Sequence, residues 1–227
     1  MKEYRIILLD ADDTLFDFGA CEREALRLAF QKYGYPLNDA ISKRYSEINK
    51  ALWKRYELGE IDRHTVIYSR FGVLFQEIGI EDKGVGFEDD YQELLGMQSI
   101  LIEEAIEVLN YLKDKYDLYI VTNGVTATQY SRLQESGVDR YVKKIFVSEE
   151  TGSQKPRKEY FDYCFDRIEN LDLSKTLIIG DTLSSDILGG NNAGIDTCWY
   201  NPYAHVNHTS ARVDYEIRNL KELYHIL

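Results

Sequence analysis

Residues 6–14 read IILLDADDT, four consecutive aliphatic residues followed by a short acidic stretch. A continuous aliphatic run of this length is typical of a strand buried on both faces of a parallel sheet. The run stops at Asp10, and Asp12 follows on the same side of an extended chain. One carboxylate at such a strand end could act as a nucleophile while the other moves protons. A solvated acidic turn explains these residues equally well when they are taken alone.

Further apolar runs alternate with helical patterns toward the C-terminus. The predicted strands cover Leu118–Val121, Ile145–Val147, Leu177–Ile179 and, more weakly, Thr197–Tyr200. The predicted helices cover Ile102–Lys115, Thr126–Ser136, Lys158–Glu169 and Ser185–Ala193. This alternation predicts an α/β fold with a doubly wound parallel-sheet core.

The segment after the first strand interrupts this rhythm. It has no convincing buried strand, and its helical periodicity falls into three or four blocks. We therefore expect residues 1–15 and 99–227 to form the α/β core, and residues 16–98 to form an inserted helical cap. Because ligands bind at the carboxyl ends of strands in open α/β sheets, such a cap would cover that edge.

Composition excludes several classes of partner. The chain has 227 residues and a formal net charge of -12, so nucleic-acid polymers and anionic membranes are poor partners. Three cysteines that form no CxxC motif, Cys21, Cys164 and Cys198, indicate reduced thiols in a cytoplasmic protein. No stretch is apolar for long enough to span a bilayer, and residues 6–9 are too few for a signal peptide.

A second polar group follows the run Leu118–Val121. Thr122, Asn123 and Gly124 stand between this strand and a helix expected to begin near Thr126. A hydroxyl and free backbone amides beside a helix start suit a phosphate oxygen, because amides and the helix dipole favour an anion. A simple helix cap and turn is the plainer interpretation of these residues taken alone.

Lys155 is a candidate for a fixed cation. A single loop lysine is usually solvated, but an acidic site that receives an anionic substrate needs local positive charge. Pro156 would stiffen the placement of Lys155 and open the helix that begins near Lys158.

Two more carboxylates follow the run Leu177–Ile179. Asp181 comes directly after Gly180, and Asp186 lies five residues further on. Oxygen ligands of this kind suit Mg²⁺, which takes few protein carboxylates and keeps waters and substrate oxygens. Acidic residues favoured by a helix dipole are the alternative interpretation.

These four groups resemble the motifs of the haloacid dehalogenase (HAD) superfamily. They occur in the same order, and each stands at a strand end or in a loop beside one. That superfamily carries strand-DxDx[TV], strand-[ST], a lone lysine and strand-GDxxxD, and the helical insertion is similar to its cap. A closer resemblance is to the YjjG-type pyrimidine 5′-nucleotidases. It is carried by residues 10–16 (DADDTLF), 49–53 (NKALW), 122–124 (TNG), 148–156 (SEETGSQKP), 180–182 (GDT), 185–194 (SDILGGNNAG) and 197–199 (TCW).

The resemblance implies a phosphomonoester hydrolase that works through an aspartyl-phosphate. Asp10 would be the nucleophile, and Asp12 would protonate the leaving oxygen and then activate water. Thr122, Asn123 and Gly124 would bind the phosphoryl group, and Lys155 would offset its charge. Mg²⁺, with Mn²⁺ or Co²⁺ as substitutes, would be held by Asp10, the Asp12 carbonyl and Asp181, with Asp186 behind them.

The substrate would be a small phosphomonoester, in the closer family a pyrimidine nucleoside monophosphate, including modified ones. Asn49, Lys50 and Trp53 lie on one helical stretch of the cap and could read a base. Aromatic residues at helical spacing are more often packed inside, so Trp53 and Tyr56 are also expected to fill the cap interior.

Several alternatives stay open. A phosphoglycolate or sugar-phosphate phosphatase, or a phosphomutase, would share every core motif, and a non-catalytic phosphate-binding regulator could use the same fold. A dehalogenase fits less well, because it has no need of Asp12 to protonate a leaving group. We expect a monomer or a small homo-oligomer.

Overall fold

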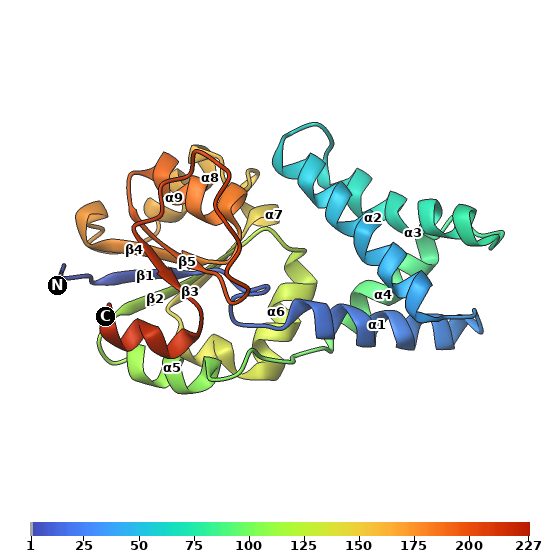
Figure 1. Cartoon of the computed structure of the whole chain (residues 1–227), viewed down its shortest axis with the longest axis horizontal. Helices are drawn as coiled ribbons and strands as arrows, with labels where there is room; N and C mark the ends of the chain where they lie inside the picture. Colours follow the sequence, from blue (N-terminus) through green and yellow to red (C-terminus); the bar gives the residue numbers. More distant parts are fainter. Residues whose placement is uncertain (1) are drawn as a thin grey trace. The chain divides into compact units, whose positions relative to one another are not determined.

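The computed structural model describes residues 2–227. Among these residues, six strands form one parallel sheet (Figure 1). The strand order is β3-β2-β1-β4-β5-β6, so the chain winds outward from β1 in both directions. This confirms the doubly wound parallel core. The strands are β1 (Ile6–Leu9), β2 (Asp117–Thr122), β3 (Lys144–Val147), β4 (Thr176–Gly180), β5 (Asp196–Tyr200) and β6 (Tyr215–Ile217).

Helices pack against both faces of the sheet, and the side chains of β1 point alternately into the two apolar clusters that result. Ile7 and Leu9 belong to one cluster, and Ile6 and Leu8 belong to the other. The first cluster contains side chains from α5 (Ala105–Leu112), α6 (Thr126–Ser136) and the 3₁₀ helix η4 (Leu220–His225). The second contains side chains from α8 (Lys158–Phe165) and α9 (Leu188–Ala193).

Some elements differ from the sequence-based expectation. The helix predicted over Lys158–Glu169 ends at Phe165, and the one predicted from Ser185 begins as a π-helical turn, η3 (Leu183–Ile187). The edge strand β6 was not predicted, because it is three residues long and exposes Glu216. Short elements complete the core: η1 (Val138–Tyr141), α7 (Ser148–Thr151) and η2 (Leu173–Lys175).

The chain divides into two compact units, one comprising the segment up to Phe18 together with Ser99–Leu227, and the other Gly19–Gln98. The helical unit thus begins at residue 19 rather than 16, because the preceding residues still bond within the core. The amide of Asp17 donates to the carbonyl of Ile100 at 3.0 Å, and Phe16 forms an antiparallel bridge with Leu101. The outgoing and returning segments therefore run side by side within the first unit.

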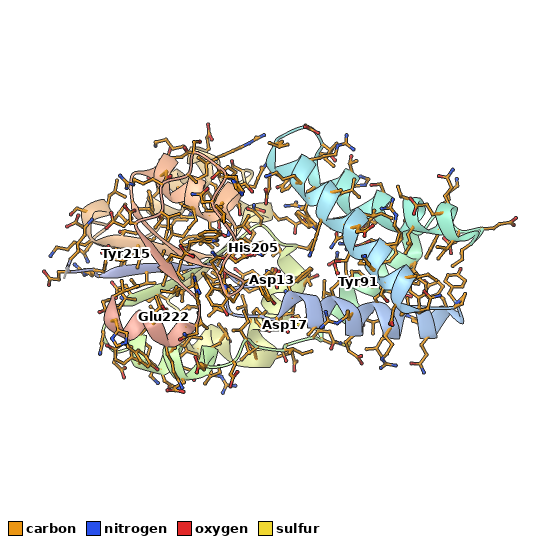
Figure 2. The ribbon with its side chains drawn as sticks, in the orientation of Figure 1. Asp13, Asp17, Tyr91, His205, Tyr215 and Glu222 are labelled. Atoms are coloured by element: carbon orange, nitrogen blue, oxygen red, sulfur yellow. The ribbon has the colours of Figure 1, made fainter. Side chains whose placement is uncertain are left out.

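The second unit is built from α1 (Phe18–Tyr33), α2 (Asp39–Glu57), α3 (Arg63–Ile78) and α4 (Val85–Gly96). Aromatic rings fill its interior: Phe71 stacks on Tyr45 at 4.7 Å between centroids and meets Tyr91 edge-on at 5.1 Å. Figure 2 shows Tyr91 among the helices of this unit. As expected, no strand of the described chain lies in this unit.

A network of buried polar side chains lies within this aromatic interior. Arg70 donates to both carboxylate oxygens of Glu88 at 2.8 and 2.5 Å and to the Asn49 side-chain oxygen at 2.9 Å. The Asn49 amide nitrogen in turn donates to Glu22 at 2.7 Å. Arg70 and Glu88 expose 2% and 0% of their surface, so each depends on the other for charge compensation.

Replacing Arg70 by methionine should lower the free energy of unfolding by about 3–5 kcal/mol, because Glu88 would stay buried without its counter-ion. Chemical denaturation followed by circular dichroism measures this change. Arg44→Met is the matched control: Arg44 pairs with Glu77 at the surface, so its loss should matter little. Equal effects of the two substitutions would contradict the assigned importance of the buried pair.

The three cysteines are buried and free of disulfides, as expected. Between residues 2 and 227, no helix has the combined length and apolar character that a membrane span requires.

Candidate active site

Strand register brings three predicted residues to one edge of the sheet. Leu9 pairs with Ile120 on β2 and with Ile179 on β4, so the residues that follow these three positions emerge together. They are Asp10, Val121 with Thr122, and Gly180 with Asp181. Because β1 and β4 flank the point where the strand order reverses, this edge is where open α/β sheets bind ligands.

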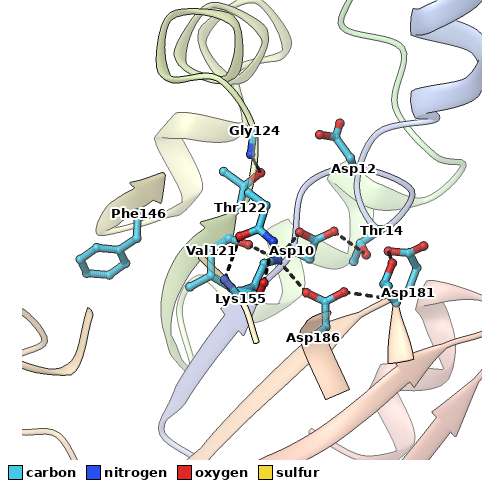
Figure 3. A network of polar contacts seen from close by, with 12 residues as sticks. Asp10, Asp12, Thr14, Val121, Thr122, Gly124, Phe146, Lys155, Asp181 and Asp186 are labelled. Atoms are coloured by element: carbon cyan, nitrogen blue, oxygen red, sulfur yellow. Dashed lines mark hydrogen bonds and ion pairs between the residues drawn. The ribbon is translucent and has the colours of Figure 1, made fainter. Parts of the chain in front are cut away.

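Lys155 reaches this edge from a loop and joins two of its carboxylates (Figure 3). Its Nζ donates to Asp10 Oδ1 at 2.6 Å, to Asp186 Oδ1 at 2.6 Å and to the Val121 carbonyl at 2.8 Å. These contacts use all three ammonium donors, and the residue is 2% exposed. The lysine is therefore a fixed internal cation rather than a solvated loop residue.

Asn123 holds the loop that carries Lys155. Its side-chain oxygen accepts from the Lys155 amide at 2.9 Å, and its side-chain nitrogen donates to the Lys155 carbonyl at 2.9 Å. Only a phosphate contact was expected for Asn123 from the sequence, so this second function was not predicted. The contact joins two loops that are 32 residues apart in the sequence, so no local sequence pattern could predict it.

The turn after β4 is shaped around Asp186. The Thr182 amide donates to Asp186 Oδ2 at 3.1 Å, while the amides of Asp186 and Ile187 both donate to the Thr182 carbonyl, which widens the turn. A Cβ added at Gly180 would lie 2.3 Å from Asp186 Cγ, so only glycine admits this carboxylate. Both oxygens of Asp186 are thus engaged by protein groups.

Asp10, Asp181 and Asp186 each offer an oxygen within 4.8 Å of the others. Burial, reinforced by Asp186 and opposed by Lys155, raises the pKa of Asp10 to about 8. Burial and the neighbouring carboxylates Asp186 and Asp10 raise the pKa of Asp181 well above its ordinary value. Burial alone would lower the pKa of Lys155, but Asp10 and Asp186 raise it above its usual range.

One lysine cannot balance the charge of three clustered carboxylates, so a further cation at this edge would favour the charged forms of Asp10 and Asp181. An all-oxygen donor set of this kind fits a hard divalent cation such as Mg²⁺. Asp10 and Asp181 could contribute carboxylate oxygens directly, whereas the engaged oxygens of Asp186 suit a supporting position.

Two side chains that were not predicted from the sequence, Gln129 and Arg132, connect Asp12 to Thr122. Gln129 Nε2 donates to Asp12 Oδ2 at 3.0 Å and to Thr122 Oγ1 at 2.8 Å. Arg132 Nη1 forms a short ion pair with Asp12 Oδ1 and donates to Gln129 Oε1 at 2.9 Å. The sequence shows that Gln129 and Arg132 are three residues apart on one helix. It does not show which face of that helix points toward Asp12.

The remaining predicted substrate residues lie in the helical unit. Asn49 is 1% exposed, and both atoms of its amide bond to Arg70 and Glu22, so it is an interior residue. Tyr56 is buried, as expected, whereas Trp53 is only half-buried and meets Tyr56 edge-on at 5.6 Å. Lys50 is exposed.

Comparison with known proteins agrees with this geometry. A family model described as haloacid dehalogenase-like hydrolase matches residues 4–194. The HAD-hydrolase YfnB of Bacillus subtilis is 48% identical, covering 100% of this chain and 97% of that protein. Its crystal structure, in an orthorhombic form bound to magnesium that reveals interdomain movement, covers 100% of this chain and 99% of that one at a TM-score of 0.96.

Two pyrimidine 5′-nucleotidases are also similar along most of the chain. PynA of Streptococcus pneumoniae is 40% identical, covering 97% of this chain and 93% of its own length. YjjG of Escherichia coli is 31% identical, covering 97% and 96% respectively.

Proposed function

Because the chain belongs to the haloacid dehalogenase-like hydrolase family, we propose that it is a phosphatase that releases the 5′-phosphate of pyrimidine nucleoside monophosphates. The observation that carries this proposal is the buried pairing of Asp10 with Lys155, beside Asp181 and Asp186, at the carboxyl edge of the sheet. A nucleophilic carboxylate, a fixed cation and an oxygen-rich cation site are the groups that phosphoryl transfer to an aspartate requires.

In this mechanism Asp10 attacks the phosphorus atom. An unassisted approach would be unfavourable, since two unit negative charges 4 Å apart repel by about 4 kcal/mol at an effective dielectric constant near 20. Lys155 reduces this repulsion because its ammonium holds Asp10 Oδ1. The Thr122 hydroxyl and the Asn123 backbone amide would bind the phosphoryl oxygens, whereas the Gly124 amide already donates to Thr122 Oγ1.

Asp12 would move the protons. As the bond between phosphorus and the ribose oxygen breaks, the Asp12 carboxyl gives its proton to that oxygen, and the phosphoryl group remains on Asp10. The Asp12 carboxylate then takes a proton from water as the water oxygen attacks phosphorus, which releases phosphate and the free Asp10 carboxylate.

Asp10, Asp181 and the Asp12 carbonyl would hold Mg²⁺, with Asp186 supporting them, and the ion would supply positive charge to the phosphoryl oxygens. The magnesium bound in the crystal structure of YfnB supports this choice of ion. The relatives PynA and YjjG, which match along the helical unit as well as the core, support a pyrimidine nucleotide as substrate.

Phosphate release should require a divalent cation. Removal of metal with EDTA should lower activity at least about 100-fold, since a bound ion contributes several kcal/mol to such reactions, and added Mg²⁺ should restore it. The assay measures phosphate released from UMP, dUMP, dTMP, AMP, GMP, glucose 6-phosphate and phosphoglycolate. Preference for the pyrimidine nucleotides is expected.

Each contrary outcome corrects a different part of the proposal. Faster hydrolysis of phosphoglycolate or the sugar phosphate would replace the substrate class but keep the chemistry. Full activity in EDTA would remove the role assigned to Mg²⁺. Absence of phosphate release from every ester would favour a binding function for this fold.

A further inference from the structure

Gln129 and Arg132 link the proton-transferring carboxylate to the phosphate-binding hydroxyl. We propose that these two residues are positioning residues that fix the orientations of Asp12 and Thr122 as one unit, an inference that rests on the phosphatase chemistry proposed above. Neither residue has to touch the substrate for this function. Each acts through a side chain that does.

Arg132 is placed for this function by burial and by its contacts. Its side chain is 1% exposed, and its guanidinium lies 4.5 Å from the ring centre of Phe16, in the same loop that carries Asp12. A buried guanidinium requires a paired anion, and Asp12 provides the carboxylate. The carboxylate is thereby held on one side while it remains 29% exposed on the other, where a proton can be exchanged.

Arg132 also sets the orientation of the Gln129 amide. Because Nη1 donates to Gln129 Oε1, the amide nitrogen faces the other way, toward Asp12 and Thr122. Its two N–H groups then satisfy one acceptor each. A reversed amide would place an oxygen against the Asp12 carboxylate, so this arrangement has one favourable orientation.

The consequence for Thr122 follows from counting its hydrogen-bonding positions. Its Oγ1 accepts from Gln129 Nε2 at 2.8 Å and from the Gly124 amide at 3.3 Å. A hydroxyl has two acceptor positions and one donor, so the hydrogen of Thr122 must point to a further acceptor. A phosphoryl oxygen is the acceptor that this site would receive.

Asp12 itself lies apart from the lysine-centred contacts. Figure 3 shows its carboxylate turned away from Asp10, Lys155 and Asp186, and no hydrogen bond or ion pair is drawn between Asp12 and these residues. The Asp10 network therefore does not orient Asp12, and the contacts from α6 do. Loss of these contacts should impair proton transfer while the nucleophile stays in place.

Two phosphate esters that differ in their leaving groups test this proposal independently of nucleotide preference. When the P–O bond breaks, p-nitrophenyl phosphate releases p-nitrophenolate, a stable anion that needs no proton, whereas benzyl phosphate releases benzyl alcohol, whose oxygen must be protonated as it leaves. With Arg132→Met, we expect kcat for benzyl phosphate to fall about 100-fold with little change in KM. p-Nitrophenyl phosphate should still give a stoichiometric rapid burst of phenolate, followed by slow turnover, because only the second step needs Asp12.

Companion variants separate positioning from a structural role. Asp12→Asn combined with Arg132→Met should be no slower than Asp12→Asn alone, within about twofold, because Arg132 acts through Asp12. Arg132→Lys should recover part of the loss. Gln129→Met, which removes no charge, should slow benzyl phosphate and also raise KM through Thr122, whereas Gln134→Met on the exposed face of α6 should change neither.

Several results would overturn the proposal. An equal loss of the phenolate burst and of benzyl phosphate turnover in Arg132→Met would indicate general damage to the site, as would multiplicative effects in the double variant. If Arg132→Met does not fold, Gln129→Met carries the same comparison of leaving groups. Wild-type protein that releases phosphate from neither these two esters nor the nucleotides would instead overturn the phosphatase function, and this inference with it.

Discussion

Replacing Asp10 by asparagine should lower phosphate release at least about 10⁴-fold while leaving the fold intact. The amide cannot attack phosphorus as a carboxylate does, so no aspartyl-phosphate forms. Its side-chain oxygen can still accept from Lys155 Nζ, which holds Asp10 Oδ1 at 2.6 Å in the native chain. Initial rates with Mg²⁺ and the thermal midpoint of the variant measure the two parts of this expectation.

The control for this substitution is Asp162→Asn, the same change in an exposed carboxylate on α8. It should leave the rate unchanged. Mg²⁺ should also raise the thermal midpoint of the native chain more than that of Asp10→Asn, because the variant loses a charged ligand. If Asp10→Asn kept most of its Mg²⁺-dependent activity, another residue would have to be the nucleophile.

Replacing Lys155 by methionine should affect both stability and catalysis. The free energy of unfolding should fall by about 3–5 kcal/mol, because Asp10 and Asp186 would stay buried without their shared cation. The rate should fall about 10²–10³-fold, because a preorganised positive charge beside the phosphoryl group is lost. Denaturation without divalent ions and initial rates with saturating Mg²⁺ measure the two effects separately.

Lys158→Met is the matched control for this second prediction. Lys158 lies three residues further along, is exposed and pairs with Asp162 on the surface of α8, so neither stability nor rate should change noticeably. A Lys155→Met protein as stable and active as the Lys158→Met protein would mean that the carboxylate cluster does not depend on its internal cation.

The core was predictable from the sequence where burial is complete. The aliphatic run of β1 is buried on both faces, so its residues carry no polar alternation and could be assigned to a central strand. The edge strand β6 offers no such pattern, because Glu216 faces solvent. The π-helical turn η3 was not predicted either, and within it the Asp186 side chain accepts from the Thr182 amide, a contact that the sequence pattern does not reveal.

The site was predictable as far as each residue sits at a strand end or just beyond one. Asp10, Thr122 and Asp181 follow strands that pair directly, so their meeting is a consequence of register. Gln129 and Arg132 could not be found in this way, because their contacts depend on how α6 is rotated about its axis. Lys155 was identified as a cation, but the two side-chain bonds by which Asn123 fixes its loop were not.

The bridge between Phe16 and Leu101 has a consequence for how this chain could evolve. Residues that oppose each other in such a pair have Cα atoms about 5 Å apart, so a tight turn could close the gap left by the whole segment Gly19–Gln98. The helical block is thus an insertion whose first and last residues leave and rejoin the core at adjacent positions. Exchanging it for the block of another phosphatase would leave the sheet register untouched, so the helical unit and the core can diverge as separate modules.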